Sequence, residues 1–449
     1  MAILRLHKDS NRLNGYQSGI HNLHLLDLAI AQLMADFPDN TRFLLGFSGG
    51  MDSTVLLHAL IQKLPLHRLQ AIYINHGLQS ESEDWAKHCA KVCEKYGVAF
   101  QSIAIQIPST ARQGVESIAR QKRYQTLCEQ ADPQTVLLTA HHQRDQAETF
   151  LLNLARGGGI AGLAAMPMLK KTSWVVGSSV CHYRPLLNVP YAVLGDYAQQ
   201  YQLDWIEDQS NTDQRFRRNY IRHEILPKFN QAWPFFEANV AQSAHHLGEG
   251  LGLLDELAAI DLQSCSHNAF AIQVPSALLS NFARVKNLIR YWVSLFDLKI
   301  QLNQSILDWI EKMFEVENPQ SQPQRYLAKG CLRIYHSTLF FYENFLETYQ
   351  VRLQDFSPSG LQFWNAALMA DLKHLDTIFL GQTIHLRSLS SLEANWLDKP
   401  KNLKRWFKQH QVPVWDRKRW PVVEVDGNPV GVLGYDSLKT FRGKQLPKS

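Results

Sequence analysis

Four short apolar runs alternate with helical patterns over the first third of the chain. The runs cover 42–47, 69–77, 100–107 and 135–142, and helical spacing covers 54–64, 83–96 and 115–131. Each run is apolar almost throughout, which is typical of strands buried on both faces of a parallel sheet. The sequence therefore predicts an α/β domain in which helices cover both faces of a parallel sheet.

The pattern changes after about residue 230. Helical spacing follows at 237–262, 276–296 and 303–315, with a predicted hairpin in 325–343 and a linker-like stretch, QDFSPSG, at 354–360. The last residues mix short strands with a basic helix near 400–410. We predict an α/β domain at 1–230, with an extension and helix at 1–40, a mainly helical middle domain at 231–352 and a small α+β domain at 360–449.

Length and composition limit the class of protein. A chain of 449 residues is too long for one ordinary core, and 45% hydrophobic with 19% charged residues is ordinary for a globular protein. The apolar stretches are too short to cross a membrane, so no membrane partner is expected. Residues 1–20 lack the hydrophobic region of a signal peptide, so we expect a cytoplasmic protein. The 6 cysteines contain no C-x-x-C pair, which indicates reduced thiols.

Residues 48–53 read SGGMDS and join the first predicted strand to the helix that follows. Ligands of open parallel sheets bind beyond the carboxyl ends of the strands, and glycines let a backbone approach a ligand closely. The N-terminus of the helix adds positive potential, so phosphate is the expected ligand. The lysine of a Walker A loop is absent, which makes Asp52 the candidate to hold Mg²⁺. The alternative is a tight turn whose Ser and Asp side chains only cap the helix.

SGGMDS is also the signature of the PP-loop ATP pyrophosphatases, and further motifs narrow the resemblance. They are INHGLQSESEDWA (74–86), ESIARQKRYQ (116–125), TAHHQRDQAETFLLNLARGGGIAGLAAM (139–166), RPLL (184–187) and EDQSNTDQRFRRNYIRHEILP (207–227). The tail at 403–434, LKRWFKQHQVPVWDRKRWPVVEVDGNPVGVLG, follows them. From about residue 40 to its end, the chain resembles the tRNA(Ile)-lysidine synthetase family.

This resemblance implies a ligase that changes the wobble cytidine of a CAU-anticodon isoleucine tRNA into lysidine. Cytidine O2 attacks the α-phosphate of ATP and releases pyrophosphate, and lysine then displaces AMP at C2. The implied partners are ATP, Mg²⁺, this tRNA and free L-lysine, and a homodimer is left open. The nucleotide-binding residues implied by the motifs are Ser48, Gly49, Gly50, Met51, Asp52, Ser53, Asn75 and Gly158.

Asp145 and Glu148 are candidates to bind lysine. They stand three residues apart on the helix predicted after the fourth strand, so they share a face. The side-chain amine of free lysine has a pKa of about 10.4, so only about one lysine molecule in 2500 is uncharged and nucleophilic at pH 7. Carboxylates that hold the ammonium form are therefore expected. The matching family positions recognise lysine, whereas the alternative is a solvated helix face. Family members often have D-D-Q where this chain has Arg144-Asp145-Gln146, which leaves the role of the first position open.

The matching motifs supply the remaining catalytic candidates. His141, with His142 beside it, ends the fourth predicted strand, where a histidine can equally be a packing residue. Arg120 and Arg123 match the family's A-R-x-x-R-Y and are candidates to bind phosphate or a site carboxylate. Gly158 lies in a glycine run that is either a loop over the nucleotide or a helix C-cap.

Two basic segments predict contacts with tRNA. The segments are 215–228 and 399–419. Each contains a single acidic residue, and the second contains Trp406, Phe407 and Trp415. The candidate contacts are Arg215, Arg217, Arg218, Arg222, Lys404, Arg405, Lys408 and Arg417. Lysine and arginine bind phosphate, and aromatic rings can stack on bases. The alternative is a solvated face whose aromatic residues belong to the core.

Two other functions are weighed against this interpretation. A tRNA-thiolating PP-loop enzyme would use the same ATP loop, but it is expected to carry a C-x-x-C pair, which the sequence lacks. A non-catalytic RNA-binding module could keep a degenerate nucleotide fold. The presence of Asp52, Asp145 and Glu148 argues against that alternative.

Overall fold

The computed structural model describes residues 19–75, 77, 81–106, 115–132, 134–175, 178–296, 298, 300, 302–315, 323–327, 330–342, 350–353, 375, 382–392, 402–410 and 412–435. The chain divides into two compact units, residues 1–253 and 254–449. This division is coarser than the three predicted domains, whose boundaries stay a prediction. The predicted linker at 354–360 lies outside the described residues. No helix among the residues listed above is long and apolar enough to cross a membrane.

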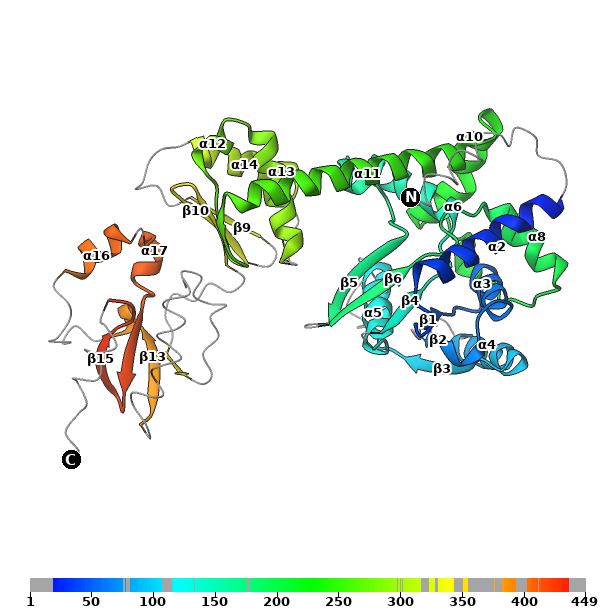
Figure 1. Ribbon diagram of the computed structural model, residues 1–449, viewed down its shortest axis with the longest axis horizontal. Coiled ribbons are helices and arrows are strands. Elements are labelled where there is room, and N and C mark those ends of the chain that lie inside the picture. The colour runs from blue at the N-terminus through cyan, green and yellow to red at the C-terminus, as the bar shows by residue number, and fades with distance from the viewer. Residues whose placement is uncertain are drawn as a thin grey trace. The chain divides into compact units, whose positions relative to one another are not determined.

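The first unit is built on a six-stranded sheet (Figure 1). Its strands are β1 (Arg42–Gly46), β2 (Leu69–Asn75), β3 (Ala99–Ala104), β4 (Thr135–Leu138), β5 (Leu169–Val175) and β6 (Ser178–Tyr183). They lie in the order β3-β2-β1-β4-β6-β5 and pair in parallel, except that β5 is antiparallel to β6. The prediction of a parallel sheet is confirmed, with one antiparallel edge hairpin that the strand–helix pattern did not predict.

Helices cover both faces of this sheet, as predicted. One face carries α2 (Gly19–Asp36), α3 (Met51–Ile61), α4 (Ser82–Tyr96) and α8 (Tyr191–Gln200), and the other carries α5 (Val115–Glu129). The alternation of side chains along β1 explains both cores, because Phe43 and Leu45 enter the first and Leu44 enters the second. All three side chains are fully buried.

A second group of helices lies beyond the carboxyl end of β4. Its members are α6 (Gln143–Ala155), α7 (Ile160–Leu163), α9 (Arg217–Tyr220), the π-helical turn η3 (Ile221–Ile225), α10 (Leu226–Ala232) and α11 (Phe236–Gln263). Short 3₁₀ turns, η1 (Leu66–Arg68) and η2 (Gln209–Thr212), complete the first unit. Ala147 of α6 packs with Ile221 and Leu226 in a small core of its own. This contact holds α9 and η3 against α6, where the candidate lysine-binding carboxylates lie.

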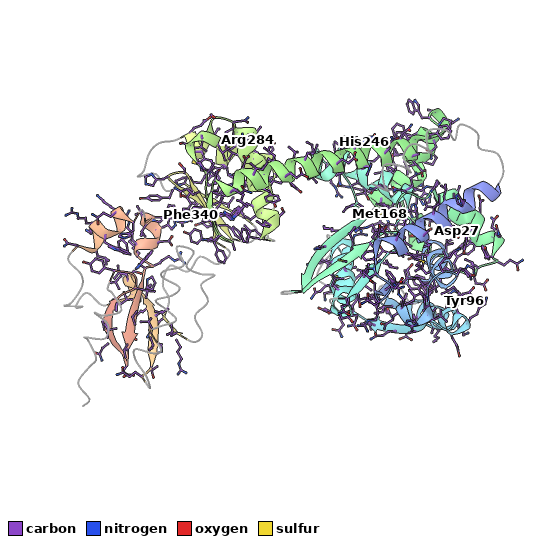
Figure 2. The ribbon with its side chains drawn as sticks, in the orientation of Figure 1. Asp27, Tyr96, Met168, His246, Arg284 and Phe340 are labelled. Carbon is purple, nitrogen blue, oxygen red and sulfur yellow. The ribbon has the colours of Figure 1, made fainter. Side chains whose placement is uncertain are left out.

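The second unit begins with a five-stranded antiparallel sheet. Its strands, in the order β7-β8-β11-β10-β9, are β7 (Ser266–His267), β8 (Ala271–Gln273), β11 (Thr338–Tyr342), β10 (Cys331–Tyr335) and β9 (Gln324–Tyr326). The helices α12 (Ser276–Leu279), α13 (Phe282–Leu295) and α14 (Gln304–Glu315) accompany it. One predicted helix, 276–296, is divided because the Asn281 side chain caps α13 by accepting from the Arg284 amide. Arg284, labelled in Figure 2, also pairs with Asp261 of α11.

The C-terminal part of the chain is a small α+β structure, as predicted. Its antiparallel sheet contains β12 (Gln350–Arg352), β13 (Ile384–Ser388), β14 (Pro421–Val425) and β15 (Asn428–Val432), with α16 (Leu403–Gln409), α17 (Val414–Arg417) and the turn η6 (Leu389–Ser391). Strand β12 pairs with β13, although the predicted boundary assigns residues up to 352 to the middle domain. Phe407 and Trp420 pack with Val422 in the core of this part.

Candidate active site

The turn between β1 and α3 needs glycine at its second position. Gly49 has a φ of 78°, in the left-handed region. A Cβ there would lie 2.6 Å from Ile206 Cδ1 and 2.8 Å from Cys89 Sγ, so a side chain would displace the core. The Gly49 carbonyl accepts a hydrogen bond from the Ile206 amide at 2.8 Å. The segment around Ile206, which precedes α9, therefore fixes the position of the turn.

Hydroxyl groups hold the rest of the loop in shape. The Ser53 hydroxyl donates to the Gly50 carbonyl at 3.0 Å and lies 3.1 Å from the Ser48 hydroxyl. The Thr54 hydroxyl donates to the same carbonyl at 3.0 Å. The first-turn amides of α3, which begins at Met51, have no partner within the helix. Amides at such a helix terminus, here at the carboxyl end of β1, can bind an anion.

His142 joins this loop to the carboxylate pair of α6. Its Nε2 lies 3.5 Å from Asp52 Oδ2 and 3.5 Å from Asp145 Oδ2, and its side chain is fully buried. Burial works against protonation, but the charges of Asp145 and Asp52 outweigh it and raise the pKa of His142 above its ordinary value. Asp52 Oδ1 is buried and has no hydrogen-bond partner among the residues that the structure describes.

Arg218 and Arg222 pair with both candidate lysine-binding carboxylates. Arg218 contacts Asp145 Oδ1 at 2.8 Å through Nη2 and Glu148 Oε2 at 2.5 Å through Nε. Arg222 contacts Glu148 Oε1 at 2.6 Å and reaches Asp145 Oδ1 only at 3.4 Å. The two arginines were predicted to bind tRNA, and the structure places their guanidinium groups inside the site.

The two carboxylates differ in their access to a ligand. The side chain of Glu148 is 0% exposed and that of Asp145 is 11% exposed. Burial opposes ionisation of Asp145, but the positive charges of His142 and Arg218 outweigh it and hold the pKa of this carboxyl well below its usual range. Asp145 Oδ2 also accepts the His142 amide at 3.0 Å. Glu148 therefore holds the arginines, while Asp145 remains partly open.

Arg144, the departure from the family pattern, points its charge away from this pair. Its Nε lies 3.2 Å from Glu237 Oε1 of α11, and its guanidinium carbon lies 4.2 Å from the centre of the Tyr191 ring. Tyr191 in turn packs against the ring of His142. The cation thus fastens α6 to α11 and α8.

His141 lies beside the carboxylate pair and bonds to Thr139. Its Nδ1 is 2.8 Å from the Thr139 hydroxyl. Burial lowers the pKa of His141 to about 3, and nearby Arg120, Arg184 and Arg218 favour the neutral ring against the opposing charge of Asp145. His141 is accordingly neutral near pH 7, whereas His142 is held toward its charged form.

Three further predicted site residues lie on α5 and at the end of β2. Arg120 and Arg123 are exposed on α5, and the guanidinium of Arg120 lies over the Tyr124 ring. Asn75 ends β2 at the same edge of the sheet as the phosphate loop, and its side chain accepts the Gly77 amide at 2.9 Å.

The glycine run after α6 forms a helix C-cap. Gly158 N donates to Asn153 O at 2.8 Å and Gly157 N donates to Leu154 O at 3.0 Å, which is the Schellman arrangement. A Cβ on Gly158 would lie 2.9 Å from that same Asn153 oxygen, so glycine is required for the cap itself. The amide predicted to contact nucleotide is used within the cap in this structure.

The basic residues of the tail fall into two groups. Lys404, Arg405 and Lys408 are exposed on α16, whereas Arg417 donates to the Val412 carbonyl at 2.9 Å. Arg419, in the same basic run, is 2% exposed and pairs with Asp416. Charge alone did not reveal that Arg419 enters the core.

Of the three tail aromatics, two are in the core. Phe407 and Trp415 are 3% and 7% exposed, so stacking on bases is closed to them in this structure. Trp406 is half-buried and packs against Trp420 and Tyr435.

Comparison with known proteins agrees with this geometry. A family described as the PP-loop domain matches residues 24–229, and one described as the TilS substrate C-terminal domain matches residues 388–447. The tRNA(Ile)-lysidine synthase of Hydrogenovibrio crunogenus is 44% identical over 93% of this chain and 99% of its own length. The chain belongs to the tRNA(Ile)-lysidine synthase family.

Other members of the family are more distant. The tRNA(Ile)-lysidine synthase of Actinobacillus pleuropneumoniae is 34% identical over 89% of this chain and 97% of its own length. That of Coxiella burnetii is 30% identical, over 92% and 93%. Among solved structures, the U34-tRNA thiolase NcsA of Methanococcus maripaludis with its [4Fe-4S] cluster is 18% identical, with a TM-score of 0.41, and covers 50% of this chain and 78% of that one.

For this member of the lysidine synthase family, the sequence missed the residues that support the site. Thr139 and His182 are buried polar residues that bond to each other across 43 residues of sequence, so no local pattern marks their contact. The RPLL motif did mark Arg184, without a role. Glu148, the carboxylate partner of Arg218 and Arg222, lies 70 and 74 residues before them in the sequence, so no local pattern links them.

Proposed function

We propose that this chain forms lysidine on tRNA(Ile) at the carboxyl edge of its first sheet, with the phosphate loop and the α6 carboxylates as one active site. The observation that carries this proposal is the position of His142, whose Nε2 lies 3.5 Å from a carboxylate of each part. A single side chain, that of His142, therefore lies between the loop that binds the ATP phosphates and the carboxylate that binds the amine.

The first half-reaction uses the loop. The amides at the start of α3 hold the ATP phosphates, and the loop leaves the α-phosphate open to cytidine O2. Asp52 fits Mg²⁺, because its buried Oδ1 has no protein partner and Mg²⁺ is commonly held by one or two carboxylates together with phosphates and water. When bound there, Mg²⁺ would neutralise phosphate charge. No group of three or more His, Cys, Asp or Glu suited to a metal occurs among the described residues, so a closed all-protein cage is not proposed.

The second half-reaction uses Asp145. Its side chain is partly open, and its Oδ1 accepts from Arg218 at 2.8 Å and only weakly from Arg222 at 3.4 Å, a contact that an ammonium group can replace. Because the pKa of Asp145 is held low, this carboxylate binds the lysine ammonium and is a poor acceptor of its proton. Glu148 keeps both arginines in place from its buried position.

The charges of the site give the reaction an order. Asp52, Asp145 and Glu148 face Arg218, Arg222 and His142, whose pKa is raised, so the negative charge of the site is largely balanced. An incoming ammonium group therefore gains little Coulomb energy from the ligand-free site. Phosphate groups of ATP and tRNA compete with Asp145 for the two arginines, which stay paired with Glu148. Lysine is therefore expected to bind tightly only after the nucleotide.

The function is tested by incubating the protein with ATP, radiolabelled lysine and total tRNA. We expect one labelled tRNA species, which sequencing identifies as the CAU-anticodon isoleucine tRNA with the label at its wobble cytidine. Asp52→Asn should abolish pyrophosphate release, while Asp196→Asn, an equivalent change at an exposed position of α8, should leave it unchanged. Label that appears without pyrophosphate release, or pyrophosphate release that needs no tRNA, contradicts the proposal.

The same experiment separates the alternatives. A non-catalytic RNA-binding module binds tRNA without consuming ATP. A thiolating enzyme consumes ATP but transfers sulfur and ignores lysine. Burial raises the pKa values of Cys89 and Cys93 to about 12, which makes these two thiols poor nucleophiles and gives thiolation no support.

A further inference from the structure

A continuous row of side chains leads from β6 to His141. Arg184 Nη2 lies 3.1 Å from His182 Nδ1, His182 Nε2 lies 2.8 Å from the Thr139 hydroxyl, and that hydroxyl lies 2.8 Å from His141 Nδ1. His182 is 1% exposed, Arg184 6% and Thr139 8%. None of the first three residues has a place in the mechanism derived above. The row is nevertheless continuous, because each side chain lies within hydrogen-bond distance of the next.

The direction of each hydrogen bond follows from Arg184. A guanidinium can only donate, so His182 Nδ1 must accept and the proton of that ring is on Nε2. His182 Nε2 then donates to the Thr139 oxygen. The threonine hydroxyl has one proton, and His141 Nδ1 is its remaining partner. His141 Nδ1 therefore accepts, and the proton of the neutral His141 ring is on Nε2.

The other arrangements of protons are less favourable. If His141 carried its proton on Nδ1, the buried Thr139 hydroxyl would have no acceptor for its own proton among the described residues, which costs about 1–3 kcal/mol. If His141 were charged, it would sit in a buried place near Arg184 and Arg120. The row of partners thus selects one neutral tautomer.

We infer that Arg184, His182 and Thr139 are positioning residues that fix His141 as a neutral hydrogen-bond donor, through Nε2–H, to an oxygen of the adenylylated substrate. This inference rests on the proposed function. Within the described residues His141 makes its hydrogen bond through Nδ1, and its side chain is half-buried, so Nε2 is the nitrogen left for a ligand. The next residue, His142, caps the helix that carries Asp145. A fixed donor of this kind stabilises charge on a phosphate or cytidine oxygen.

The inference also excludes one role for His141. Its Nδ1 is occupied by the Thr139 hydroxyl and its Nε2 already carries a proton, so neither nitrogen can take the proton of the lysine ammonium. His141 acts by donating a hydrogen bond in place, and the proton of lysine leaves by another route.

The tautomer can be observed directly, without substrates. In long-range proton–nitrogen NMR of the ligand-free protein labelled with ¹⁵N-histidine, we expect the His141 signal, assigned by its loss in His141→Gln, to show a neutral ring protonated on Nε2 at pH 7. Thr139→Ser should keep this pattern, whereas Thr139→Val should change it. A ring protonated on Nδ1, or a charged ring, in the unchanged protein overturns the inference.

Turnover tests the role of the donor. Thr139→Val should lower kcat for lysidine formation by about tenfold or more, since loss of one such donor costs about a hundredfold or more where it acts fully. The KM values for ATP and lysine should change little, and Thr139→Ser should restore most of the rate. Thr126→Val on α5 is the matched control for removal of a threonine hydroxyl.

The outcomes separate this inference from the proposed function. Thr139→Val with unchanged kcat overturns the positioning role, and so does Thr139→Ser that is as slow as Thr139→Val while both remain folded by circular dichroism and bind ATP. If the unchanged protein forms no lysidine, the proposed function fails, and the NMR result still decides whether the tautomer is fixed.

Discussion

Asp145 and Glu148 lie one helical turn apart, but their surroundings differ and so do their expected roles. Glu148 is fully buried and receives three contacts from Arg218 and Arg222, so it cannot lose its charge without leaving two guanidinium groups half-paired. Asp145 is partly open, and its two shortest contacts come from the His142 amide, which caps the helix, and from Arg218. Mutations at the two positions should consequently affect different properties.

Asp145→Asn should raise KM for lysine by about one to two decades, because each charge-assisted contact is worth about 1.5–3 kcal/mol. KM for ATP and the midpoint of thermal unfolding should change much less. Glu148→Gln should instead lower the stability of the first unit, by about 3 kcal/mol or more, since it leaves buried charge uncompensated. Steady-state kinetics and urea unfolding of both variants measure the contrast; equal effects of the two changes on KM for lysine contradict it.

At this scale the sequence located residues better than it assigned their contacts. SGGMDS predicted the loop, and the spacing of Asp145 and Glu148 predicted their shared face. Arg218 and Arg222 drew attention as part of a basic run, but their ion pairs depend on the packing of Ile221 and Leu226 against α6, which no local pattern shows. Thr139 and His182 meet only because β4 and β6 are neighbours in the sheet.

At the scale of elements, the site depends on how α6 is fixed by the helices around it. Arg144 and Glu237 connect α6 to α11 at a partly buried position, with 29% and 13% of their side chains exposed. Asn230 of α10 also donates to Glu237 at 2.8 Å. The cation that replaces a common family carboxylate therefore has a structural partner in this chain.

A double-mutant cycle measures this connection. Arg144→Asp places like charges beside each other and should destabilise the protein by about 1–3 kcal/mol, whereas Arg144→Asp combined with Glu237→Arg should recover part of the loss. The free energies of unfolding in urea give the coupling. If the two single changes and the double change are additive within about 0.5 kcal/mol, α6 and α11 are not coupled through this pair.

The helical segment that carries Arg218 and Arg222 should control the order of binding. Titration calorimetry of lysine should give weak binding to the free protein and at least tenfold tighter binding when ATP and tRNA(Ile) are present, because phosphates release the arginines from Asp145. A non-hydrolysable ATP analogue separates binding from reaction. Lysine affinity that is the same with and without nucleotide contradicts this order.

Elements were predicted well wherever the pattern was long. The helices and strands of the first sheet lie within a few residues of their predicted positions, because buried parallel strands and amphipathic helices leave strong periodic signals. Strands β7 and β8 were missed because they are only two and three residues long. The capping side chain of Asn281 divided a helix that apolar spacing alone joins into one.

At the scale of the whole molecule, side chains of the second unit connect its five-stranded sheet to α17. The Tyr342 hydroxyl donates to Asp416 Oδ2 at 2.6 Å and accepts from Trp415 Nε1 at 2.8 Å. Phe340, labelled in Figure 2, packs in the same cluster. Asp416 in turn holds Arg419 at 2.9 Å. Charged residues of the tail are therefore divided between holding this structure together and remaining exposed to solvent.

The exposed group on α16 is proposed to bind the tRNA backbone. Lys404 and Lys408 stand four residues apart and Arg405 lies beside them, while Leu403 and Phe407 on the other side of the helix are buried. If these cations contact phosphates, tRNA binding depends steeply on salt, and each neutralised phosphate contributes about −0.7 to −0.9 to the slope of log K against log salt.

Changing Lys404, Arg405 and Lys408 together to glutamine should weaken tRNA binding and flatten that slope by about 2, while ATP affinity stays unchanged because the phosphate loop lies in the other unit. Glutamine keeps the length and helix propensity of these side chains, so the fold should persist. The matched control is Arg417→Gln, whose guanidinium already donates to the Val412 carbonyl and whose loss should alter stability more than the slope. Filter binding at several salt concentrations decides the question, since a merely solvated face predicts an unchanged slope for the triple variant.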